Sequence, residues 1–166
     1  MNIYGVTGWK NTGKTGLMER LVQEMVGRGL TVSTVKHAHH DTETDLPGTD
    51  SYRHRQAGAR EVLLSSPRRW ALMHELREES EPMLAELLTR LAPVDLVLVE
   101  GYKRADHPKI EAHRAAAGRA LLAPDNSTIR AVASDVTLEG LPCPVLPLDD
   151  TAAIADFILR DLGMAR

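Results

Sequence analysis

A glycine-rich segment near the amino terminus constrains the fold of this chain more than any other feature. Residues 8–15 read Gly-Trp-Lys-Asn-Thr-Gly-Lys-Thr and match the pattern G-x-x-x-x-G-K-[ST] at every fixed position. An apolar run at residues 3–7 precedes the segment, and an amphipathic stretch follows it. A loop of this kind joins a strand to a helix, because glycine lets the backbone curl where the chain changes direction. We therefore expect a strand, the loop and a helix in that order.

The same segment predicts a site for the phosphates of a nucleotide. Backbone N–H groups of such a loop surround phosphate oxygens, and the helix that begins there adds its positive end. Lys14 would place an ammonium group against the β- and γ-phosphates, and the Thr15 hydroxyl would ligate Mg²⁺. The predicted nucleotide-binding residues of the segment are Gly8, Trp9, Lys10, Asn11, Thr12, Gly13, Lys14, Thr15 and Gly16. Lys10 could contact a phosphate or a partner, but an exposed lysine is the favoured interpretation, and Lys10 is given no catalytic role.

Alternating apolar and amphipathic stretches predict an α/β fold. Apolar residues from Leu17 to Val26 recur at helical spacing, and residues 30–35 form a β-branched run, so that a βαβ unit opens the chain. Further strands are expected at residues 94–99, 129–133 and 145–148, and further helices at residues 50–59, from Ser80 onward and after Asp149 or Asp150. We expect a mostly parallel sheet flanked by helices, as in P-loop NTPases, in a single domain over residues 1–166.

A hairpin is expected in the middle of the chain. Residues 61–65 and 69–73 have strand-like patterns and flank the turn Ser66-Pro67-Arg68. Proline and arginine suit the edge of a sheet, where they discourage further pairing. The hairpin is therefore predicted to be an antiparallel edge of the main sheet.

A phosphate loop needs an acidic partner for its metal ion, and this partner usually ends a neighbouring apolar strand. Glu100 stands at that place after residues 94–99, and Gly101 lets the chain pass close to a γ-phosphate. Glu100 would hold Mg²⁺ through a water molecule or orient the attacking water. The candidate catalytic residues are therefore Lys14 and Glu100.

The segment Lys36-His37-Ala38-His39-His40-Asp41 follows the second strand and leaves three interpretations open. Imidazole and carboxylate groups of His37, His39 and Asp41 suit a transition metal. Lys36 and the histidines equally suit an anion, and Asp41 suits Mg²⁺. A polar surface loop is the third interpretation.

Two further sites are suggested beyond this loop. Arg53 and His54 belong to a basic cluster that suits a phosphorylated small molecule or an acidic partner, or forms a solvated helix face. The chain contains no Asn-Lys-x-Asp motif, the usual reader of guanine. Asp135 ends a candidate strand at the expected edge of the sheet, where its carboxylate could accept hydrogen bonds from guanine. A turn or cap aspartate remains the alternative.

Composition excludes several classes of protein. The 166 residues carry 20 Lys and Arg against 23 Asp and Glu, and the net charge of −3 argues against a nucleic-acid binder. No apolar run approaches the roughly 20 residues that span a membrane. Cys143 is the single cysteine and fits a reducing compartment. The amino terminus lacks the pattern of a signal peptide. A cytoplasmic protein is expected.

The motifs together resemble the MobB family of molybdopterin-guanine dinucleotide biosynthesis adapter proteins. The resemblance rests on residues 6–15, 36–41, 45–54, 57–59 and 98–103. It implies a GTP-binding protein that uses Mg²⁺, is at most a slow GTPase, and assists the guanylyltransferase MobA, which joins GMP to molybdopterin. It also implies homodimers formed through an extended sheet, which would use the hairpin.

Within this resemblance, the possible contacts of molybdopterin or another anion are Lys36, His37, His39, Arg53 and His54. Two other functions remain open on the same scaffold. One is a small-molecule kinase, and the other is a GTPase that delivers a metal ion through the histidine-rich loop.

Overall fold

A computed structural model describes residues 1–38 and 43–164 of the chain. The chain divides into two compact units, one formed by Met1–His37 with Leu91–Arg166 and the other by Ala38–Arg90. The expectation that residues 1–166 act as a single domain stays a prediction.

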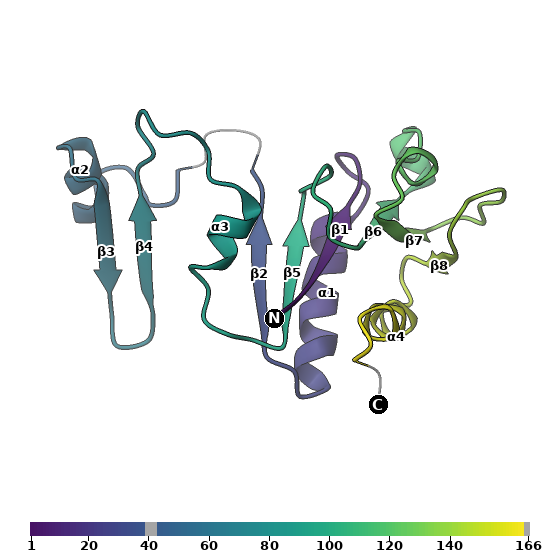
Figure 1. The fold of residues 1–166 in the computed structure, drawn as a ribbon. Coiled ribbons are helices and arrows are strands. Elements are labelled where there is room, and N and C mark those ends of the chain that lie inside the picture. Colours follow the sequence, from purple (N-terminus) through teal and green to yellow (C-terminus); the bar gives the residue numbers. More distant parts are fainter. Residues whose placement is uncertain (39–42, 165–166) are drawn as a thin grey trace. The chain divides into compact units, whose positions relative to one another are not determined.

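A six-stranded sheet in the order β2-β5-β1-β6-β7-β8 forms the centre of the first unit, and its neighbouring strands are parallel. The strands are β1 (Asn2–Thr7), β2 (Val32–Lys36), β5 (Leu96–Glu100), β6 (Lys109–His113), β7 (Ile129–Ser134) and β8 (Val145–Pro147). Figure 1 shows β1, in purple, between β5 and β6. Because the strands are parallel, the loops after their carboxyl ends meet at one edge of the sheet.

Two helices build the core of this unit against the sheet. Helix α1 (Lys14–Gly27) and helix α4 (Thr151–Asp161) pack against each other, and their side chains join one apolar cluster with those of the strands. The helices contribute Leu17, Met18, Leu21, Met25, Ile154, Ala155 and Ile158 to this cluster. The helical spacing predicted that Val26 belongs to the buried stripe of α1. Val26 is instead 54% exposed, because in the last turn of the helix it does not face the sheet. In the described residues, no helix has both the length and the apolar character needed to cross a membrane.

Strand β5 is covered on both faces, as its nearly continuous apolar sequence predicts. Leu96 and Leu98 belong to the cluster with α1 and α4, and Val97 and Val99 alternate with them and are also buried. A strand in this position is held rigidly by its neighbours. The residue that ends it, Glu100, is therefore fixed in place.

The second unit contains the predicted hairpin and two short helices. Its elements are α2 (Asp50–Gln56), β3 (Glu61–Ser65), β4 (Trp70–His74) and α3 (Leu84–Leu88). The two strands pair antiparallel from Glu61 with His74 to Ser65 with Trp70, but they form a sheet of their own and not an edge of the six-stranded sheet. Helix α2 begins at the residue after Thr49, whose side chain accepts a hydrogen bond from the N–H of Tyr52.

A buried arginine ties this second unit together. The guanidinium of Arg55, on α2, donates to Glu43 at 2.7 Å, to Glu75 at 2.6 Å and to Asp45. These hydrogen bonds raise the pKa of Arg55 above its ordinary value, and the one from Arg55 lowers the pKa of Asp45. The Arg55 side chain thereby binds both the segment before α2 and the residue that follows the hairpin.

Two elements differ from the expectation drawn from the sequence. The helix expected from Ser80 begins only at Leu84, where the carboxylate of Glu86 accepts a hydrogen bond from the N–H of Met83 at 2.8 Å. Strand β6 was not predicted, because its sequence Lys-Ile-Glu-Ala-His carries charged residues that a strand in the centre of a sheet rarely buries.

We expect Leu21→Ala to lower the free energy of unfolding by about 2–5 kcal/mol, because it leaves a cavity in the cluster beneath the sheet. Urea denaturation followed by circular dichroism measures the loss. Val26→Ala, on the exposed side of the same helix, is the matched control and should change stability by no more than about 0.5 kcal/mol. Equal losses from the two substitutions would contradict the assignment of the core.

Candidate phosphate-binding site

The glycine-rich loop between β1 and α1 is closed tightly against strand β6. Gly8 has a φ of +138°, and a Cβ atom added there would lie 2.5 Å from the carbonyl oxygen of Ala112. Neither the backbone angle nor the space accepts a side chain at this position. At the other end of the loop, the carbonyl of Gly13 accepts the N–H of Leu17 at 2.9 Å and starts the helix. The loop therefore has the strand–turn–helix setting that its sequence predicts.

The carbonyl oxygen of Trp9 binds two other residues of this loop. It accepts hydrogen bonds from Thr12 Oγ1 at 2.8 Å and from the ammonium group of Lys14 at 2.5 Å. The Lys14 side chain thus folds over the loop toward its first residues. Burial lowers the pKa of Lys14, and the charge of Glu100 acts in the opposite direction.

Glu100 meets the loop from the neighbouring strand. In the sheet, Glu100 stands beside Val6 of β1 on one side and Lys36 of β2 on the other. Its Oε1 accepts a hydrogen bond from Thr15 Oγ1 at 3.3 Å, and its Oε2 lies 3.8 Å from the ammonium group of Lys36. The residue is only 8% exposed. Hydroxyl and carboxylate oxygens are ligands that Mg²⁺ prefers, so this pair fits the predicted metal.

The segments after β2 and β5 approach each other closely at the same edge. The N–H of His37 donates to the carbonyl of Glu100 at 2.9 Å, and the rings of His37 and Tyr102 lie 4.8 Å apart. Gly101 has a φ of +98°, and a Cβ atom there would lie 3.2 Å from the His37 carbonyl oxygen. The structure therefore brings Lys36 and His37 next to Glu100.

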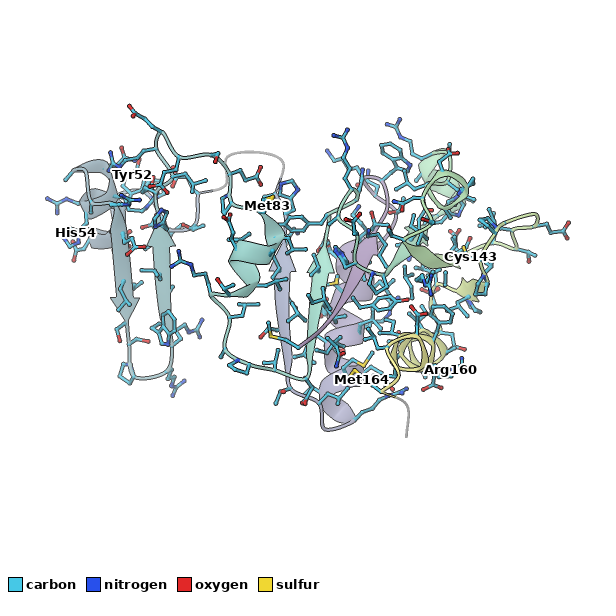
Figure 2. The ribbon with its side chains drawn as sticks, in the orientation of Figure 1. Tyr52, His54, Met83, Cys143, Arg160 and Met164 are labelled. Carbon is cyan, nitrogen blue, oxygen red and sulfur yellow. The ribbon has the colours of Figure 1, made fainter. Side chains whose placement is uncertain are left out.

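The other predicted members of the histidine-rich loop, His39 and Asp41, lie outside the described residues. Across residues 1–38 and 43–164, no group of three or more His, Cys, Asp or Glu side chains has the arrangement of a metal site. Arg53 and His54 are exposed on α2 in the second unit, where Figure 2 labels His54. The contact of Arg53 and His54 with an anion stays a prediction.

Asp135 follows β7, as expected for a residue that reads the base. Its Oδ1 accepts the N–H of Ala115 at 2.9 Å, which holds the short helix η1 (Ala115–Ala117) to the end of β7. The side chain is otherwise exposed at the edge of the sheet where the phosphate loop lies. Its role toward a base stays a prediction. Cys143 lies in the segment before β8 (Figure 2), and burial raises the pKa of its thiol, as expected of a packed residue.

The sequence analysis assigned no role to two residues beside the loop. Glu111, on β6, is buried, and its carboxylate accepts the N–H groups of Leu122 and Ala123 at 2.9 Å. Burial raises the pKa of this carboxyl group. Lys103, on the segment after β5, places its ammonium group 4.1 Å from the centroid of the Trp9 ring. No pattern in the sequence indicates Glu111, since its strand was not recognised, whereas Lys103 stands three residues after the predicted Glu100.

Comparisons with known proteins converge on one family. The family model "Molybdopterin guanine dinucleotide synthesis protein B" (MobB) matches residues 3–135. The molybdopterin-guanine dinucleotide biosynthesis adapter protein of Escherichia coli K12 is 41% identical over 156 residues, which cover 92% of this chain and 88% of that protein. The protein of the same name from Haemophilus influenzae is 39% identical, over 94% of this chain and 86% of its own length.

Solved structures are similar over nearly the whole chain. The crystal structure of a MobB protein homolog from Bacillus stearothermophilus aligns with a TM-score of 0.72 and 30% identity. The alignment covers 99% of this chain and 100% of that one.

Gly8→Ala should destabilise the protein more than a glycine substitution elsewhere with a positive φ. Strain in the left-handed region costs roughly 1–2 kcal/mol, and the contact with the Ala112 carbonyl should add roughly 1–3 kcal/mol. Gly29→Ala is the matched control, because Gly29 has a φ of +86° and nothing within 4 Å of an added Cβ atom. Thermal denaturation of both variants compares the losses. Similar losses would show that the loop does not press against β6.

Proposed function

The chain belongs to the MobB family, and from that premise we propose that it is a GTP-binding adapter of molybdopterin guanine dinucleotide biosynthesis. We place GTP and Mg²⁺ at the loop of residues 8–15. The observation that carries this proposal is the meeting of Thr15 with the buried carboxylate of Glu100 at 3.3 Å. A hydroxyl group at the start of a helix and a carboxylate at the end of the neighbouring strand are the oxygen groups that would hold Mg²⁺ in a magnesium–triphosphate complex.

Each residue of the site has a defined task in this proposal. The backbone of the loop and the ammonium group of Lys14 hold the β- and γ-phosphates. Thr15 ligates Mg²⁺, and Glu100 holds it through a water molecule. When bound, Mg²⁺ neutralises charge on the β- and γ-phosphates during hydrolysis. Lys36, 3.8 Å from Glu100, keeps that carboxylate oriented at the mouth of the loop.

Hydrolysis of GTP is proposed to be slow. Glu100 is bound on one oxygen by Thr15 and faces Lys36 with the other. A carboxylate held in this way positions a metal-bound water well, but it is not free to turn toward a water that attacks the γ-phosphate. An adapter that changes state with its nucleotide needs only such a slow reaction.

Guanine specificity is assigned to Asp135. Its Oδ1 is fixed by the N–H of Ala115, so the carboxylate stands in one orientation at the edge of the sheet. Guanine presents two donors, N1–H and the 2-amino group, which a carboxylate accepts together. Adenine has an acceptor at N1 and cannot replace them.

The partners follow from the family and from the second unit. We propose that the protein assists MobA and contacts molybdopterin in the cytoplasm, with Lys36, His37, Arg53 and His54 as the described candidate contacts. A homodimer would form through the hairpin. Its exposed apolar side chains are Leu63, Leu64, Trp70 and Leu72, and a groove of about 1300 Å³ lies between the hairpin and α3. A second copy of the hairpin would cover this surface.

Lys14→Ala should weaken GTP binding by about 100-fold or more while the protein remains folded. Hydrogen bonds from a charged group contribute about 1.5–3 kcal/mol each, and 1.4 kcal/mol is a factor of ten in affinity. Isothermal titration with GTP and Mg²⁺ measures the loss, and circular dichroism checks the fold. Arg68→Ala, which removes one positive charge from the hairpin turn, is the control and should bind GTP as before. Unchanged affinity in folded Lys14→Ala would contradict the site.

Asp135→Asn should change which base is preferred. The unaltered protein is expected to bind GTP at least about tenfold more tightly than ATP, since hydrogen bonds to a charged group contribute about 1.5–3 kcal/mol each. Asparagine keeps the acceptor for Ala115 but offers an N–H₂ group to the base, which suits the second carbonyl of xanthine. Titration with GTP, ATP and xanthosine triphosphate should show the preference move toward the last. Equal affinity of the unaltered protein for ATP and GTP would count against the function.

A further inference from the structure

Lys103 connects the segment after β5 with the phosphate loop. Its ammonium group lies 4.1 Å from the centroid of the Trp9 ring. Trp9 is itself fixed, since its indole N–H donates to the carbonyl of Ala120 at 2.7 Å. Its own carbonyl accepts the ammonium group of Lys14, the group placed against the β- and γ-phosphates. Lys103 therefore stands at the γ-phosphate end of the proposed site.

The charges at this end of the site are unbalanced. Among the described residues, the charged groups that act on the pKa of Lys14 are Glu100, Lys103 and Lys36. The charge of Lys103 also lowers the pKa of the buried Glu111 carboxyl group, so three lysines face two carboxylates, although the chain as a whole has a net charge of −3. Like charges gathered in this way repel one another, and a bound anion with several negative charges offsets the repulsion.

The backbone at Lys103 is held by polar side chains from the segment before β7 and from the start of β6. The side chain of Asn126 donates to the Lys103 carbonyl at 3.1 Å and accepts the hydroxyl of Thr128 at 2.6 Å. Lys109, which is 1% exposed, donates to Thr128 Oγ1 at 2.7 Å and to the carbonyl of Ala105. Two polar anchors thus fix the main chain at Lys103 and two residues after it.

The ammonium group of Lys103 is held far less firmly than the backbone beneath it. Its side chain is partly exposed, and its contact is with the face of a ring, which attracts a cation weakly at exposed sites. A phosphate oxygen binds an ammonium group more strongly, through a charge-assisted hydrogen bond. The interaction energy of the Lys103 ammonium group therefore becomes more favourable when it leaves the ring and binds a nearby anion.

We propose that Lys103 is a further phosphate-binding residue of this site, which leaves the Trp9 ring to contact the γ-phosphate and gives the site a preference for a nucleoside triphosphate over a diphosphate. The inference rests on the proposed function. It assigns the γ-phosphate because Lys103 follows Glu100 and Gly101, the pair that the carboxyl end of the neighbouring strand brings to the terminal phosphate.

Trp9 provides a direct readout of this movement. The chain has two tryptophans, and the second, Trp70, lies in β4 of the second unit. In a full-length protein that carries Trp70→Phe, tryptophan emission reports on Trp9 alone. Departure of the Lys103 ammonium group from the indole face should change that emission when a non-hydrolysable GTP analogue binds with Mg²⁺, and GDP should change it less.

The test compares the affinities for the GTP analogue and for GDP by isothermal titration in the Trp70→Phe protein. Lys103→Met should lower the affinity for the analogue by about 10- to 100-fold and that for GDP by less than about threefold, because a charge-assisted hydrogen bond to the γ-phosphate is lost. The difference in Trp9 emission between the two nucleotides should disappear with it. Arg104→Met, which removes the exposed cation next in sequence, is the matched control and should leave both affinities within about threefold.

The outcomes separate this inference from the proposed function. Equal losses for both nucleotides, or no loss for either, in a folded Lys103→Met protein would overturn the role of Lys103 and leave the GTP site standing. An unaltered protein that binds neither nucleotide would overturn the site and this inference together. Lys103→Arg keeps the charge and should retain most of the preference for the triphosphate.

Discussion

The parallel pairing of β1 with β5 is the interaction on which the candidate site depends. It sets Val6 beside Glu100, so the loop that leaves β1 and the acidic residue that ends β5 reach the same edge of the sheet. The register cannot shift by even one residue, since such a shift would turn the Glu100 side chain to the other face of the sheet. The apolar side chains that bury β5 on both faces hold this register. The hydrophobic core thereby fixes the distance between Thr15 and the carboxylate.

The β-branched and apolar runs predicted most of the sheet because local sequence determines such elements. Strand β6 was not predicted, because the groups that stabilise its buried charged residues lie outside the strand. The carboxylate of Glu111 accepts the N–H groups of Leu122 and Ala123. The ammonium group of Lys109 donates to Ala105 and Thr128. Partners that lie outside the strand, at irregular separations along the chain, leave no periodic signal. For the same reason the sequence indicated a hairpin but not that it forms a separate sheet.

The candidate site also contains residues that the sequence could predict and residues that it could not. The loop and Glu100 were predictable, because a contiguous motif and a strand-end acid carry their own spacing. Lys103 belongs to the motif of residues 98–103, but its role was not predictable, because its place beside Trp9 depends on Asn126 and other side chains that meet only in the folded protein. Asp135 was a candidate because it follows a predicted strand, and the structure adds its hydrogen bond with Ala115, while its role toward a base stays a prediction.

The most direct test of the central claim is a crystal structure of the full chain with a non-hydrolysable GTP analogue and Mg²⁺. The account predicts the β- and γ-phosphates within the loop of residues 8–15 and Mg²⁺ at about 2.0–2.1 Å from Thr15 Oγ1. Glu100 should lie one water molecule away from the metal. A nucleotide bound elsewhere, or a metal held without Thr15 and Glu100, would contradict it.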